Sequence, residues 1–272
     1  MKRALAVAVL VGSACVSPAR AEEPYGLPLT GEAAETFLRT AEVIRKKGIG
    51  TGITNPQQYT LRHGTRTHKA VWKTIDEFKR GITTLEGGGV IVDFADSWKH
   101  EVASYELDKL LGTGLVPPTV ERKLGQTTGS LQMWVEGAMT EADRKQKKLA
   151  PPDLQAWNEQ MYKVRLLHQL TDNTDYRNIR NVLSDPSFRV YAVDCSRGFT
   201  IYADLRGEKE LLRFSRSVLE ALRALDRPTL DAKLGRWLGG TQIEGLLKRR
   251  DKILALAAKC VAERGEAAVL YR

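Results

Sequence analysis

The stretch that decides the fold is Leu170–Asn181, which reads LTDNTDYRNIRN and separates an apolar, helix-like segment from a predicted hairpin over 182–193. Because the two outer ends of a hairpin face each other, Asn181 and Asp194 are predicted to meet at its open end. An amide oxygen beside a carboxylate, with Asp175 a few residues away, suits Mg²⁺ or Mn²⁺ bound together with phosphates. The alternative interpretation is an Asn- and Asp-rich turn that satisfies its own backbone.

A glycine-rich turn and a lysine lie earlier in the chain. Gly48, Gly50 and Gly52 recur at every second position, and such glycines let backbone N–H groups approach a phosphate without side chains in the way. The strand predicted over 69–75 places Lys73 on the face that this turn would cover, because side chains alternate along a strand. A lysine in that place supplies a positive charge to phosphate oxygens. A lysine that keeps an edge strand soluble is the alternative.

A glutamate near the start of the next predicted helix is the partner for this lysine. Apolar residues recur with a helical period over 97–111, and Gly112 ends the pattern. Glu101, in the first turn, can pair with Lys73 and fix the direction of its side chain. Compensation of the helix dipole would by itself also explain a glutamate there. Because the acidic and amide residues of 170–194 follow this pair in order, a functional interpretation of the whole set is favoured.

Composition and the first residues indicate an exported globular protein. The chain has 272 residues, 42% of them hydrophobic and 28% charged, with a mean hydropathy of −0.32, which excludes disordered, collagen-like and disulfide-framework proteins. Residues 1–21 combine a basic start, a short apolar run and Ala19-Arg20-Ala21, and so predict a secretory signal peptide. We expect export to the periplasm or the cell exterior, with no transmembrane segment in the mature chain. Losing Lys2, Arg3 and Arg20 lowers the net charge from +9 to +6, which does not argue for a nucleic-acid partner.

Two cysteines, Cys195 and Cys260, lie outside the predicted leader. They can pair in an oxidising compartment, but two distant cysteines do not establish a bond from sequence. Two separate buried thiols are the alternative. The four histidines show none of the spacings of a zinc site, and Ser196 lacks the surroundings of a hydrolase nucleophile.

The remaining pattern divides the chain into a strand-rich first half and a mainly helical second half, so we expect an α+β protein. The predicted parts are a leader at 1–21, an N-terminal lobe with a leading helix at 22–136, and a C-terminal lobe at 137–272. A flexible connector is expected at Gly87-Gly88-Gly89. The other expected elements are helices at 30–47, 153–170, 211–225, 230–238 and 243–262, and strands at 59–61, 119–122 and 131–135.

Several segments share a pattern with a known group of proteins. They are Lys73, Asp96–Leu111 (DSWKHEVASYELDKLL), Val116–Val120 (VPPTV), Gly129–Gly137 (GSLQMWVEG), Asn173–Asn181 (NTDYRNIRN) and Val193–Phe199 (VDCSRGF). Together they resemble the secretory-pathway kinases of the Golgi casein kinase and xylosylkinase type. The resemblance covers about residues 45–200, and its motif order is more specific than any one motif. HipA-like and phosphatidylinositol-kinase-like proteins have loops similar to its later part.

The resemblance implies a bilobal, protein-kinase-like fold and roles for five residues. Lys73 would contact the α- and β-phosphates of ATP, and Glu101 would orient it. Asp175 would be the catalytic base. Asn181 and Asp194 would hold Mg²⁺ or Mn²⁺.

This sequence departs from the pattern in one spacing. In related loops the base and the metal-binding asparagine lie five residues apart, whereas Asp175 and Asn181 are six apart. Asp172 or Asn178 could therefore share or take one of the two roles. The His-Arg-Asp and Asp-Phe-Gly motifs are absent from the sequence, so the resemblance is not to conventional eukaryotic protein kinases.

We therefore expect an exported, ATP-dependent phosphotransferase whose partners are a nucleotide and a hydroxyl of a protein, a sugar or a lipid. Two other functions remain open on the same fold. One is a catalytically inactive, pseudokinase-like binding protein, which the irregular spacing and export away from cellular ATP would favour. The other is a transferase that moves AMP instead of phosphate.

Overall fold

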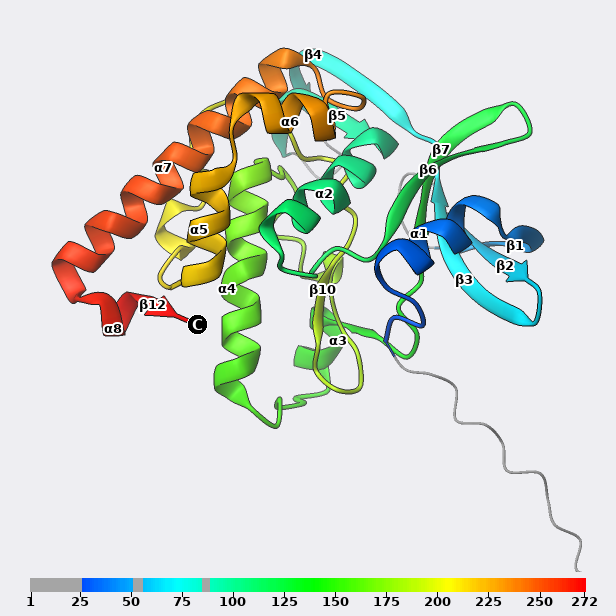
Figure 1. The fold of residues 1–272 in the computed structure, drawn as a ribbon, viewed down its shortest axis with the longest axis horizontal. Helices are drawn as coiled ribbons and strands as arrows, with labels where there is room; N and C mark the ends of the chain where they lie inside the picture. Colours follow the sequence, from blue (N-terminus) through cyan, green and yellow to red (C-terminus); the bar gives the residue numbers. More distant parts are fainter. Residues whose placement is uncertain (1–25, 51–55, 85–88) are drawn as a thin grey trace, which may run out of the picture.

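The computed structural model describes residues 26–50, 56–84 and 89–272, and the predicted leader lies outside them (Figure 1). Its first part contains α1 (Gly31–Thr40), β1 (Glu42–Gly48), β2 (Gln57–His63), β3 (Arg66–Lys73), α2 (Trp98–Leu111), β6 (Thr119–Leu124) and β7 (Thr127–Met133). The five strands form one antiparallel sheet in the order β1-β2-β3-β7-β6, and both helices contact β6 and β7.

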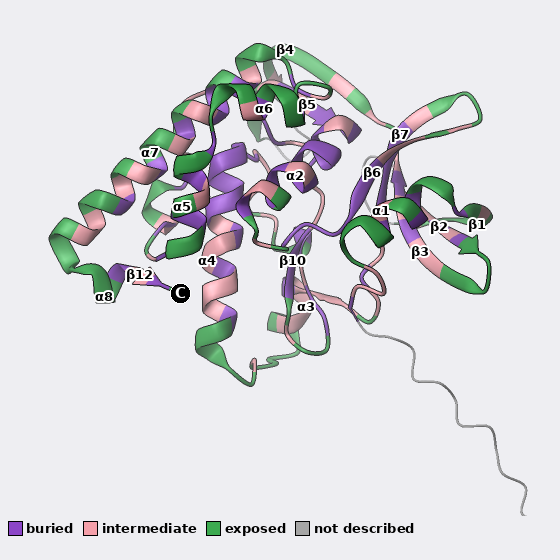
Figure 2. Ribbon diagram, viewed as in Figure 1, coloured by how far each residue is buried: buried purple, intermediate pink, exposed green. Residues whose placement is uncertain are grey.

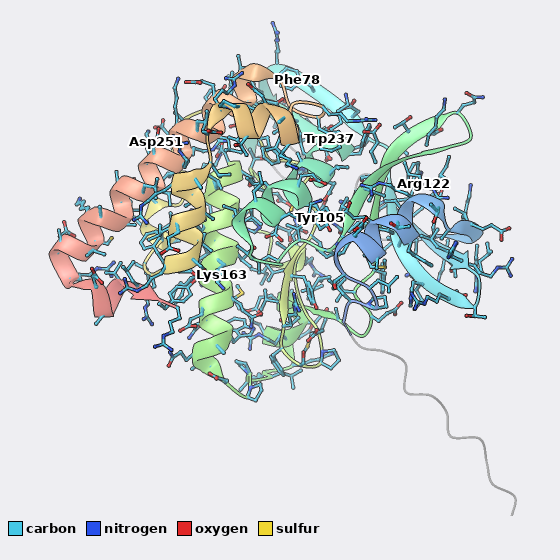
Figure 3. The ribbon with its side chains drawn as sticks, viewed as in Figure 1. Phe78, Tyr105, Arg122, Lys163, Trp237 and Asp251 are labelled. Atoms are coloured by element: carbon cyan, nitrogen blue, oxygen red, sulfur yellow. The ribbon has the colours of Figure 1, made fainter. Side chains whose placement is uncertain are left out.

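The leading helix is shorter than the predicted 30–47. Helix α1 ends at Thr40, and the following residues form β1, which pairs with β2. Val43 is β-branched and favours a strand, where its backbone gains ladder hydrogen bonds. Arg122 of β6 donates to the carbonyl oxygens of Leu38 (2.8 Å) and Ala41 (2.6 Å), which ties the end of α1 to the sheet (Figure 3). The prediction of a long helix was therefore wrong.

Helix α2 agrees with the predicted helix and has well-defined ends. The Ser97 hydroxyl accepts the backbone N–H of Lys99, and Gly112 ends the helix with a φ of +64°. Tyr105 points from α2 toward α1, where its hydroxyl donates to Glu35 at 3.1 Å (Figure 3). This contact fixes the two helices of the first part relative to each other.

A separate two-stranded ribbon precedes α2 and was not predicted. It consists of β4 (Asp76–Thr84) and β5 (Val90–Ser97), which pair antiparallel and do not join the five-stranded sheet. Most of β4 is exposed on both faces, so its sequence carries no alternation of apolar and polar residues. Of the predicted glycine connector, residues 87 and 88 lie outside the described residues, and Gly89 directly precedes β5.

The second part is mainly helical, and Figure 1 shows its helices gathered on one side of the molecule. The predicted hairpin is present as β9 and β10, and the four predicted helices correspond to α4, α5, α6 and α7, whose bounds follow; α5 begins later than expected, and α6 begins and ends earlier than the predicted 230–238. The elements are β8 (Met139–Thr140), α3 (Glu141–Gln146), α4 (Leu154–Thr171), η1 (Ile179–Asn181), β9 (Val182–Ser184), β10 (Val190–Ala192), η2 (Glu208–Glu210), β11 (Phe214–Ser215), α5 (Arg216–Ala224), α6 (Arg227–Leu234), α7 (Gly240–Arg264), α8 (Glu266–Val269) and β12 (Leu270–Tyr271).

The core consists of two hydrophobic clusters, and Figure 2 colours the buried residues purple. One lies between α1 and the sheet, and the other is formed largely by the helices of the second part. Helix α2 contributes Leu107 and Leu111 to the second cluster, so it links the sheet to the helical part. Cys195 and Cys260 are both free thiols, so no disulfide joins them. Within the described ranges, no helix is long and apolar enough to cross a membrane.

Candidate functional site

Lys73 ends β3 with its ammonium group between two carboxylates. Its neighbour Trp72 faces the core, so the alternation of the strand turns Lys73 to the other face. The Nζ atom lies 2.5 Å from Oε1 of Glu101 and 2.6 Å from Oδ1 of Asp194. The lysine side chain is only 12% exposed. Burial by itself lowers the pKa of Lys73, but the charges of Glu101 and Asp194 more than offset this, and the pKa lies above its usual value.

Glu101 joins three segments that are distant in sequence. It is completely enclosed, with Oε1 on Lys73 and Oε2 accepting the backbone N–H of Cys195 at 3.1 Å. Burial raises the pKa of Glu101, and the charge of Lys73 opposes this rise. The carboxylate therefore fixes the lysine and, through Cys195, the backbone that carries Asp194.

The start of α2 is docked on the segment that follows Asp194. Both the backbone N–H of Ser97 (3.0 Å) and the Nδ1 atom of His100 (2.8 Å) bond to the carbonyl oxygen of Ser196. Burial lowers the pKa of His100, so the ring is neutral and donates from Nδ1. On the other side of the His100 ring, the side-chain amide of Gln242 in α7 lies 3.1 Å from the His100 Nε2 atom. The same amide nitrogen donates to the carbonyl oxygen of Phe199 at 2.9 Å. Sequence reasoning missed His100, because no local pattern relates it to residue 196.

The loop after α4 brings Asp175 against two amide side chains. Its Oδ2 accepts from Nδ2 of Asn178 (3.0 Å) and from Nδ2 of Asn181 (2.9 Å). Two consecutive turns, with Asn178 N–H bonded to the Asp175 carbonyl and Asn181 N–H bonded to that of Asn178, accommodate the extra residue. The six-residue spacing is thus compatible with direct contact between Asp175 and Asn181.

Asp172 is directed elsewhere. Its carboxylate binds Nε of Arg206 at 2.6 Å and the hydroxyl of Thr200, and the residue is buried. It ends α4 in the left-handed region, with a φ of +48°. The buried Asp172 is therefore engaged in an ion pair with the half-exposed Arg206, whereas Asp175 contacts Asn181.

The hairpin places Asn181 and Asp194 at its open end, as the sequence predicts. The backbone N–H of Val193 donates to the carbonyl of Asn181 at 2.9 Å and closes the strand pair. Asp194 follows with a φ of +56°, a conformation that is costly for a residue with a side chain. Its side chain is 44% exposed, and the charge of Lys73 outweighs burial and lowers its pKa.

A cavity of about 310 Å³ lies between the sheet and the hairpin, and neither Glu101 nor Asp175 is among its lining residues. Lys73, Asn181 and Asp194 line its polar side. Ile49 and Pro56, which flank the glycine turn, line another side. Among the predicted glycines, Gly48 ends β1, Gly50 has a φ of +71°, and Gly52 lies outside the described residues. The apolar wall of the cavity comprises Val71, Met133, Val135, Leu183 and Val193.

The chain segment between the two parts has one free backbone edge. Glu136 exchanges two backbone hydrogen bonds with Gly26, at 2.8 and 2.9 Å. By contrast, the N–H and C=O of Val135, which lines the cavity, bond to none of the residues that the structure describes. An apolar slot with one free donor and one free acceptor fits a flat heteroaromatic ring. This edge could not be predicted, because free backbone groups leave no pattern in a sequence.

Comparisons with known proteins agree with this geometry. No model of a protein family and no curated protein matches the sequence. Hydra Fam20, solved with sugar, superposes with a TM-score of 0.63 at 14% identity, covering 87% of this chain and 90% of that one. A Golgi casein kinase with Mn/ADP bound gives 0.63 at 14% identity, covering 88% and 78%. The Helicobacter pylori proinflammatory kinase CtkA gives 0.53 at 12% identity, covering 84% and 98%.

These likenesses are matters of fold, because the identities are low. They confirm the resemblance to the Golgi casein kinase type and the predicted fold class at that level. The protein has a kinase-like fold, with a sheet-rich N-terminal part, a helical C-terminal part, and a cleft between them.

Proposed function

We propose that this protein is an ATP-dependent phosphotransferase that uses a divalent cation. The observation that carries the proposal is the convergence of Lys73, Asn181 and Asp194 in one cleft whose apolar side ends at the free backbone edge of Val135. Similarity of fold to kinases, one of them with Mn/ADP bound, supports it.

Asn181 and Asp194 would hold the metal ion, and their free atoms fit this role. Asn181 donates its amide N–H to Asp175, and Oδ1 has no partner among the described residues. Lys73 binds Oδ1 of Asp194, and Oδ2 of the same aspartate likewise has no partner within the described chain. One amide and one carboxylate oxygen suit Mg²⁺ or Mn²⁺ whose coordination is completed by phosphates and water. The bound ion would neutralise charge on the transferred phosphate.

The other residues would position the nucleotide and the acceptor. Lys73, held by Glu101, would supply a fixed positive charge to the α- and β-phosphates, while the apolar slot at Val135 would take the adenine ring. Asp175 would accept the proton of the acceptor hydroxyl, and its contacts with Asn178 and Asn181 aim it. Most of the rate enhancement would come from positioning and charge neutralisation.

The acceptor in this proposal is a hydroxyl of a protein, a sugar or a lipid, met outside the cytoplasm. The leader predicted at 1–21 supports export to the periplasm or the cell exterior. The glycine turn around Gly48 and Gly50 would close over the phosphates, since Ile49 and Pro56 beside it line the cleft.

Transfer is tested with two labels. The chain from Glu22 is incubated with Mg²⁺ or Mn²⁺ and a mixture of polypeptides, sugars and lipid vesicles, using ATP labelled at either the γ- or the α-phosphate. We expect only the γ-label to be transferred, and we expect Asp194→Asn to abolish the transfer. Transfer of the α-label would identify an AMP transferase instead. Nucleotide binding without transfer of either label would indicate a pseudokinase-like binding protein.

A further inference from the structure

A second cavity lies behind the loop that holds Asp175, away from the cleft. It has a volume of about 390 Å³ and is formed by α3, α4 and residues 176–182, with one residue of η2. None of its lining residues lines the cavity around Lys73 and Asp194. It is therefore a separate site, and the proposed function assigns it nothing.

Cationic side chains dominate the polar lining of this second cavity. Four of them, Arg144, Lys145, Arg165 and Arg177, face two carboxylates, those of Glu141 and Glu210. Arg144 is already compensated, because it donates to both carboxylate oxygens of Glu141, at 2.6 and 2.9 Å. The cavity therefore retains an excess of positive charge.

Two of these cations are free to bind a ligand. Neither Arg165 nor Arg177 forms an ion pair anywhere in the described ranges, and each guanidinium rests on the ring of a neighbouring tyrosine. The two arginines come from α4 and from the loop, so they approach the cavity from different elements. Guanidinium groups in this arrangement suit a phosphate or carboxylate, which they bind through paired N–H donors.

The rest of the cavity wall is mainly apolar, and it includes two buried ring nitrogens without a hydrogen-bond partner among the described residues. Trp157 and His168 are 8% and 4% exposed, and neither Nε1 of the tryptophan nor Nε2 of the histidine has a partner within the described part of the chain. Burial lowers the pKa of His168 to about 4, so the histidine adds no charge at neutral pH. Unpaired buried polar atoms are rare in folded proteins and call for a physical explanation. The apolar lining residues are Met161, Val164, Ile179 and Val182.

We propose that this cavity binds a small organic anion, in which one phosphate or carboxylate group is joined to an apolar body. Arg165 and Arg177 would bind the anionic group, and the apolar wall beside Trp157 would take the body. Because Tyr176, Arg177 and Ile179 lie between Asp175 and Asn181, a ligand there would bear directly on that loop.

Calorimetric titration of the purified chain tests the proposal with four probes. Phenyl phosphate and benzoate carry both parts of the expected ligand, benzyl alcohol carries only the ring, and inorganic phosphate carries only the anion. We expect phenyl phosphate, benzoate or both to bind at least tenfold more tightly than the two partial probes. The ratio between phenyl phosphate and benzoate identifies the preferred anionic group.

Variants locate the binding. Arg165→Gln should weaken the binding of the preferred probe about tenfold, the effect of losing one charge-assisted hydrogen bond, and Arg165→Lys should weaken it less. The matched control is Arg223→Gln, an exposed α5 residue outside the cavity, which should leave binding unchanged. If Arg165→Gln does not fold, Arg177→Gln replaces it, because Arg177 is exposed and is the other residue assigned to the anionic group.

Four results would overturn the proposal. Equal binding of benzyl alcohol would mean an apolar cavity without anion recognition. Equal binding of inorganic phosphate would mean that the ring is not recognised. Unchanged binding in folded Arg165→Gln, or no binding of any probe, would mean that the cavity is not the site.

Discussion

At the scale of single residues, the cleft depends on one lysine shared by two carboxylates. Lys73 contacts both Glu101 and Asp194, and Glu101 also holds the backbone of Cys195. A shielded ion pair of this kind adds little net stability, but removing one partner leaves the others uncompensated. Its value here lies in fixing the lysine charge and the carboxylate of Asp194 relative to each other.

Replacing the lysine should therefore impair both activity and stability. In Lys73→Met we expect loss of phosphoryl transfer and a decrease of about 3 kcal/mol in the free energy of unfolding, since Glu101 stays buried without its partner. The double variant Lys73→Met/Glu101→Gln should recover part of the stability and none of the activity. Urea unfolding and the γ-label assay measure the two effects. A fully active Lys73→Met would refute the role of this residue.

Substitution of Asp172 and substitution of Asp175 should have different effects, one on stability and the other on activity. Asp175→Asn is expected to lower kcat at least a hundredfold while leaving nucleotide affinity and stability nearly unchanged, because it removes a base without breaking an ion pair. Asp172→Asn should instead destabilise the protein, because Asp172 neutralises Arg206 in a buried position. Thermal melts and steady-state kinetics compare them. If Asp172→Asn were folded but inactive and Asp175→Asn active, the assignment would be reversed.

At the scale of elements, close approach of β3 and β7 brings Lys73 to its place. A Cβ atom on Gly129 of β7 would lie 2.3 Å from the carbonyl oxygen of Lys73 and 3.0 Å from the ring of Trp72. The backbone must move to accept a methyl group there, so the glycine is a requirement of strand spacing at the site.

Gly129→Ala should accordingly lower the free energy of unfolding by at least about 2 kcal/mol and reduce transfer activity. Gly48→Ala in β1 is the matched control, because a Cβ atom on Gly48 would meet no atom of the described residues within 4 Å and its φ is not positive. Urea unfolding of both variants measures the difference. Equal stability of the two would show that strand spacing does not depend on residue 129.

Elements whose pattern is local were predictable, and elements defined by distant partners were not. The helix at 97–111 and the hairpin at 182–193 follow from periodicity and turn spacing, whereas the contact of Lys73 with Glu101 was expected only from the kinase-like order of the motifs. Strand β1 was taken for helix because its strand character comes from pairing with β2 and from Arg122. The docking of α2 on Ser196 and the free backbone edge at Val135 likewise depend on residues that are distant in the sequence, so no local pattern predicts them.

At the scale of the whole molecule, two buried groups make stability depend on pH in opposite directions. His168 has a pKa of about 4, below its usual value, because burial disfavours its charged form. Asp108 has a pKa of about 6, above its usual value, because burial outweighs its hydrogen bonds to Thr113 and Val116. Between pH 6.5 and 4 the unfolded chain therefore binds a proton at His168 that the folded chain does not, and the reverse holds for Asp108 between about 3.8 and 6.

The stability of variants at these two positions should therefore respond to acid differently from that of the native chain. In the native chain, His168 lowers the free energy of unfolding by at most about 3 kcal/mol as the pH falls from 6.5 to 4. His168→Asn lacks this effect, so the variant should be less acid-sensitive than the native chain. Asp108→Asn removes a compensating gain and should make the chain more acid-sensitive. Urea unfolding at pH 7, 6 and 5 measures both slopes. Parallel pH dependence in all three proteins would contradict the assigned protonation states.

We propose that Lys73, Asn181 and Asp194 form a site for a metal–nucleotide complex, and calorimetric titration with ADP tests this. Binding to the native chain should require Mn²⁺ or Mg²⁺ and should be lost, or weakened at least a hundredfold, in a folded Asp194→Asn variant. Binding that is the same without metal, or that Asp194→Asn leaves unchanged, would contradict the claim.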